Sequence, residues 1–72
     1  MSRIAVIGDR ERVRSFAFAG VHTSAVEDAD ATRAAWHALP ADVALLILTP
    51  AAHLALQDEL DGRAGPLFVV MP

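Results

Sequence analysis

The clearest candidates for chemistry are a Gly-Asp pair at positions 8–9 and a Thr-Pro pair at positions 49–50, each directly after an apolar run. In a parallel α/β sheet such positions fall at the carboxyl ends of strands, where phosphates and other small ligands bind. A dinucleotide site needs the spacing G-x-G-x-x-G, because only glycines let the backbone approach the pyrophosphate closely. Here Gly8 is followed by Asp-Arg-Glu-Arg, and the Asp9 carboxylate repels phosphate. We therefore expect no nucleotide site at this turn.

Phosphoryl transfer to an aspartate, as in receiver domains, is the rival chemistry for the same edge of the sheet. It requires an Asp after the third strand, two acids after the first strand and a lysine further along the chain. This sequence has Thr49 at the first of these places, a single Asp9 at the second, and no lysine. Asp9 is better explained as a helix cap, since its carboxylate can accept from free N–H groups at a helix start. We predict that the chain is not an enzyme.

Histidine and hydroxyl side chains do not form a recognisable site either. His22, His37 and His53 lie in three different segments, without the close spacing of metal ligands. The hydroxyl groups of Ser15, Thr23 and Ser24 lack a readable base and orienting partner. The sequence predicts no metal and no cofactor.

Four short apolar runs, with a helix-like segment in each gap, must position these residues. The runs cover residues 3–7, 21–26, 43–48 and 67–71. Their alternation predicts a β-α-β-α-β-α-β order, that is, one small α/β domain over residues 1–72. Right-handed crossovers favour a doubly wound, four-stranded parallel sheet of order 2-1-3-4 with three helices, as in flavodoxin-like and receiver-like domains. The second run contains His22, Thr23 and Ser24, so we expect it at an edge.

Each predicted helix has a start signal. Asp9 precedes the first helix, whose buried stripe would be Val13, Phe16 and Ala17 and whose stop would be Gly20. Either Asp28 or Asp30 caps the second, which is expected to run to about Leu39 with a buried side. That side would carry Ala31, Ala35, Ala38 and Leu39. Thr49 followed by Pro50 opens the third helix, on which Leu54 points away from Ala52, Leu56 and Leu60.

The two later runs predict a sheet face without sufficient cover. Both are apolar at successive positions, which is typical of strands covered on both faces. In the order 2-1-3-4 the first helix covers one face only near strands one and two, and the other two helices lie on the opposite face. The first-helix side of strands three and four therefore needs more chain or another protein. Without either, we expect the isolated chain to self-associate.

The composition of the chain limits its expected partners and cellular location. The chain has 72 residues, 6 basic against 9 acidic side chains and a net charge of −3, with no basic cluster, so we expect no nucleic-acid partner. It has no cysteine, which suits the cytoplasm. No apolar run approaches the roughly 18 residues of a membrane span, so any membrane role is expected to be peripheral.

Four motifs in register resemble one family. Residues 4–9 read IAVIGD, residues 16–21 read FAFAGV, the third apolar run ends in Thr49, and residues 66–72 read PLFVVMP. Together they resemble the F subunits of the archaeal and bacterial A/V-type rotary ATPases (ATP synthases). Members of that family continue beyond the terminal proline into a C-terminal helical segment, and the sequence ends at Pro72. We therefore expect a single domain that lacks this tail.

The resemblance implies a non-catalytic rotor subunit of the central stalk. Such a subunit docks on the coiled-coil stalk subunit, through it meets the catalytic head, and couples rotation to ATP synthesis or hydrolysis. A stand-alone receiver-like regulatory domain, binding a small ligand in the crevice at residues 8–9 and 49–50, is the alternative. The side chains expected to contact a partner are Trp36, Leu46, Leu48, Leu54, Phe68 and Val70.

Overall fold

The fold is a four-stranded parallel sheet with three helices. The computed structural model describes residues 3–17, 20–61 and 65–72. In these residues the elements are β1 (Arg3–Gly8), α1 (Arg10–Arg14), β2 (Val21–Ala25), α2 (Ala29–His37), β3 (Val43–Leu48), α3 (Pro50–Leu60) and β4 (Leu67–Val70). The strand order is β2-β1-β3-β4, and every pair is parallel. Both the predicted order and the edge position of the second strand are confirmed.

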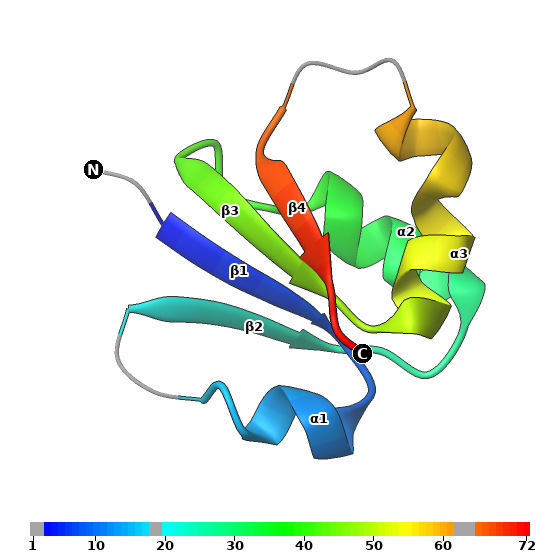
Figure 1. The fold of residues 1–72 in the computed structure, drawn as a ribbon, viewed down its shortest axis with the longest axis horizontal. Coiled ribbons are helices and arrows are strands. Elements are labelled where there is room, and N and C mark those ends of the chain that lie inside the picture. The colour runs from blue at the N-terminus through cyan, green and yellow to red at the C-terminus, as the bar shows by residue number, and fades with distance from the viewer. Residues whose placement is uncertain (1–2, 18–19, 62–64) are drawn as a thin grey trace.

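The helices are distributed unequally over the two faces. Helices α2 and α3 lie together on one side, and α1 lies on the other side beside β1 and β2 (Figure 1). The main core belongs to the α2–α3 side. Its buried members are Ala5, Ile7, Val43, Leu46, Leu48, Ala52 and Leu56. On the α1 side, Val6 and Val13 are buried.

The predicted start signals cap the helices. Asp9 accepts from the backbone N–H of Arg12, and Thr49 accepts from that of Ala52. At α2 the cap is Asp28, whose Oδ1 lies 2.7 Å from the backbone nitrogen of Ala31. The other candidate, Asp30, instead forms an ion pair with Arg33. An acid at either place suits the positive end of the helix.

Replacing Asp28 with alanine should therefore destabilise the protein by about 1 kcal/mol, because an N–H group at the start of α2 loses its acceptor. Asp30→Ala is the matched control, since the Asp30–Arg33 pair is exposed and worth well under about 1 kcal/mol. Urea unfolding of the two variants measures the difference. Equal losses would contradict the assignment of the cap.

The first two helices differ from the prediction in extent. The α-helical part of α1 ends at Arg14, and the next three N–H groups bond to carbonyls three residues back. Arginines four residues apart, at positions 10 and 14, repel one another, which weakens this short helix by about a few tenths of a kcal/mol. Ala17 is consequently exposed rather than buried, while Phe16 is half-buried. Gly20 has φ of 89° and precedes β2, well beyond the helix end.

The buried side of α2 consists of other residues than the sequence predicted. The helix ends at His37, and Ala38 is exposed. Thr32, which the alanine pattern passed over, is 3% exposed, and its hydroxyl donates to the carbonyl of Asp28 at 2.8 Å. With Ala35 and Leu39 it forms an i, i+3, i+7 stripe, so helical spacing was the signal that could have identified it.

Candidate docking surface

One face of the sheet is open on the α1 side of β3 and β4. Strand register places Ile4 beside Leu45 and Leu45 beside Leu67, and two residues further Ile47 lies beside Val69. Since neighbouring residues in register share a face, these five aliphatic side chains lie together. We call this set, Ile4, Leu45, Ile47, Leu67 and Val69, the open face.

Exposure confirms that this face lacks cover. Leu67 is 77% exposed, Val69 50% and Ile4 41%, whereas Leu45 and Ile47 are half-buried. Helix α1 packs on β1 and β2, so Val6, the neighbour of Ile47 on β1, is completely buried.

Two of the side chains expected to meet a partner lie on the opposite face. Leu46 and Leu48 are completely buried in the core with α2 and α3, so neither belongs to an exposed surface. Their neighbours Leu45 and Ile47 point the other way. The sequence could not separate these two sets, because β3 is apolar at successive positions and does not alternate.

Phe68 and Val70 also turn toward the α2–α3 side, beside Leu46 and Leu48. They lie on the outer strand and remain 40% and 39% exposed. The ring of Phe68 lies against His53 of α3, with ring centroids 5.7 Å apart. Strand β4 is therefore exposed on both of its faces, and it lies at the end of the sheet.

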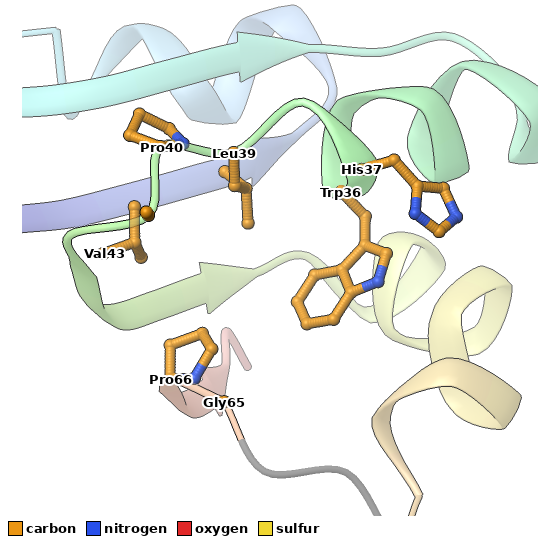
Figure 2. Close-up of a pocket in the computed structure, with 8 residues that line it drawn as sticks. Trp36, His37, Leu39, Pro40, Val43, Gly65 and Pro66 are labelled. Atoms are coloured by element: carbon orange, nitrogen blue, oxygen red, sulfur yellow. The ribbon is translucent and has the colours of Figure 1, made fainter.

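Leu54 and Trp36 lie apart from the open face. Leu54 projects from α3 and is 67% exposed, as its helical position predicted. Trp36 is half-buried against the core. It also lines a pocket of about 250 Å³ where the amino ends of β3 and β4 come together. Figure 2 shows its indole between the end of α2 and the Gly65–Pro66 segment that leads into β4.

The crevice at the carboxyl ends of β1 and β3 is acidic. A pocket of about 190 Å³ there is lined by Asp9, Glu27 and Asp28 together with Thr49 and small side chains. Three carboxylates make it unfavourable for phosphate or another anion. Thr49 is 2% exposed and caps α3. In the described part of the chain, no group of three or more His, Asp or Glu side chains could hold a metal ion.

The histidines have structural neighbours. His37 Nε2 lies 2.9 Å from Glu59 Oε1, which links the end of α2 to α3. His53 contacts Phe68, and His22 is half-buried in β2. None of the helices in the described ranges is long and apolar enough to cross a membrane.

A family model described as the ATP synthase (F/14-kDa) subunit matches residues 4–72. The chain belongs to this family. The F/14-kDa subunits are components of V/A-type ATP synthases, so the predicted resemblance is confirmed and the chain is a subunit of a rotary ATPase. Neither the curated proteins nor the solved structures gave a match.

Proposed function

We propose that the protein is a non-catalytic rotor subunit of the central stalk, which docks through its open face on the coiled-coil stalk subunit. Membership of the F/14-kDa family supports an accessory role in the ATPase complex. The observation that carries the docking proposal is an aliphatic face beside α1 that no element of the described chain covers. In this role the protein lies in the cytoplasm, peripheral to the membrane, and couples rotation to ATP synthesis or hydrolysis.

A helix of the stalk suits this face in size and polarity. The open part of the sheet is two strands wide, about 10 Å, and a helix with its side chains has about the same diameter. The stalk helix would continue the layer that α1 begins. Burying about 400 Å² of apolar surface contributes roughly 10 kcal/mol before the costs of association. Those costs are of similar size, so contacts outside the open face would have to add to the affinity.

Further contacts are proposed outside the open face. Phe68 and Val70 lie on the other side of β4 and can extend the contact around the edge of the sheet. Trp36 and Leu54 remain candidate contacts on the α2–α3 side, where a second part of the complex could meet them. Binding of an anionic small ligand at the carboxyl edge is not favoured, because that crevice is lined with carboxylates.

Val69→Glu should abolish binding to the coiled-coil stalk subunit encoded by the same organism. An unpaired carboxylate in an apolar interface costs a few kcal/mol, so we expect affinity to fall about 100-fold or more. Val69 is half exposed in the free chain, so the variant should still fold. Co-purification and titration calorimetry with the stalk subunit measure the effect.

Leu54→Glu is the matched variant, since it places the same charge at an exposed leucine on the other side of the protein. Docking through the open face predicts that Leu54→Glu still binds. If Leu54→Glu loses stalk binding and Val69→Glu keeps it, the contact lies on α3 and not on the open face. Failure of the unmodified chain to bind any stalk subunit would contradict the function itself.

A further inference from the structure

The open face has the properties of a self-complementary surface. All five of its side chains are aliphatic, and none carries a charge. Two copies of it can therefore meet without unpaired polar groups or electrostatic mismatch. The surface is also stepped, because α1 lies beside β1 and β2 (Figure 1), whereas Leu67 and Val69 of β4 are exposed.

The depth of this step matches a second sheet. Two sheets packed face to face lie about 10 Å apart, which is close to the 10–12 Å diameter of a helix. Strands β3 and β4 of a second copy can therefore lie over β3 and β4 of the first copy, at the same height above its sheet as its own α1. With a two-fold axis parallel to the strands, α1 of each copy lies beside β4 of the other, whose outward backbone groups remain in contact with water.

We propose that, without its stalk partner, the protein forms a symmetric dimer in which the open faces of two copies pack together. The interface pairs Leu67 and Val69 of each copy with Leu45 and Ile47 of the other. The occupant is a second copy rather than a charged peptide or a polar ligand, because the five side chains of the open face offer only aliphatic contacts.

The available area sets the strength of this dimer. If each copy buries about 400 Å² of this face, the two copies together bury about 800 Å². Standard stable interfaces bury roughly 1,600 Å². We therefore expect a weak dimer, with a dissociation constant of about 0.1–1 mM. Each copy has a net charge of −3, so added salt should strengthen the dimer by screening the repulsion.

Dimerisation and stalk binding use the same face and exclude one another. The stalk subunit should therefore dissociate the dimer. The dimer itself does not depend on the proposed stalk function, because it is measured with this chain alone. A dimer that the stalk subunit leaves intact would count against the docking proposal and not against the dimer.

Sedimentation equilibrium from about 10 µM to 1 mM, the range set by the expected affinity, tests the proposal. The unmodified chain should pass from monomer to dimer. Val69→Glu and Leu67→Glu, at positions 50% and 77% exposed, should remain monomeric, with the association constant at least about tenfold lower. Leu54→Glu, 67% exposed on α3, is the control and should dimerise like the unmodified chain. Thermal melts verify that each variant is folded.

Pairing of two β4 edges is the competing geometry. The N–H of Met71 donates to the carbonyl of Leu48, so alternate residues turn their backbone toward β3, and Phe68 and Val70 turn theirs outward. Val70→Pro removes an outward donor and so disrupts edge pairing, while a dimer through the open face persists. Loss of the dimer in Val70→Pro with survival in Leu67→Glu would overturn the proposal. So would a chain that stays monomeric at 1 mM.

Discussion

Leu46→Ala is expected to lower the free energy of unfolding by about 3–4 kcal/mol. The side chain is completely buried between the sheet and helices α2 and α3, so its removal leaves a cavity in the main core. A domain of 72 residues has a total stability of roughly 4–11 kcal/mol, so the variant should be close to unfolding. Urea unfolding measures the loss, provided that the variant and the unmodified chain show the same dependence of the unfolding free energy on urea concentration.

The adjacent residue provides the control. Leu45→Ala removes the same atoms from a half-buried position on the open face and should cost less, about 1–2 kcal/mol. Binding should respond in the opposite order. Leu45→Ala should weaken stalk binding and dimerisation, whereas folded Leu46→Ala should retain both. Similar stability losses in the two variants would mean that β3 is covered on both faces.

Leu45 and Leu46 also show which part of the site the sequence could not predict. An uncovered apolar face over the third and fourth strands follows from the strand order and the position of the first helix, and the structure has it. Which residues form it does not follow, because the run Val43–Leu48 is apolar on both faces. The pairing register also shifts at Ala44, with Arg3 beside Val43 but Ile4 beside Leu45. Val43 therefore lies on the core side together with Leu46, a relation that alternation alone cannot predict.

The fold was more predictable because its signals are local. Asp9, Asp28 and Thr49 each accept a hydrogen bond from the first turn of a helix, and Pro50 fits the first position of α3. The extent of α1 was not predictable in this way. Apolar spacing suggested a longer helix, but the α-helical part ends at Arg14, and beyond Val13 Phe16 is only half-buried and Ala17 is exposed.

The Gly-Asp and Thr-Pro pairs turned out to have structural roles. Gly8 is buried at the end of β1, directly against the side chain of Thr49 at the end of β3. The N–H of Thr49 donates to the carbonyl of Ile7 at 3.2 Å, and its hydroxyl caps α3. The sequence showed both pairs at one edge of the sheet. That the glycine makes room for the threonine requires the register of β1 and β3 to be known.

Gly8→Ala should be as damaging as a large cavity in the core. A Cβ at this position would overlap Cγ2 of Thr49 and lie only 3.1 Å from Oγ1 and 3.2 Å from Cβ of the same residue. Thr49 is buried and must keep its hydroxyl at the start of α3, so it cannot turn away freely. Such overpacking costs typically 1–3 kcal/mol, and we expect about 3 kcal/mol here because backbone atoms of two strands must move apart. Urea unfolding and loss of stalk binding both report the effect.

Thr49→Ser makes the cause of this loss measurable, because it removes Cγ2 and keeps the capping oxygen. Alone it should cost about 1 kcal/mol through the lost methyl group. Combined with Gly8→Ala it should recover part of the stability, so the double-mutant cycle gives a favourable coupling of about 1–2 kcal/mol. Gly65→Ala, where an added Cβ meets no atom within 4 Å, should be nearly neutral and controls for the general effect of replacing glycine. If Gly8→Ala is equally destabilising with Thr49 and with Ser at position 49, the methyl overlap is not its cause, and Gly8 is required for another reason.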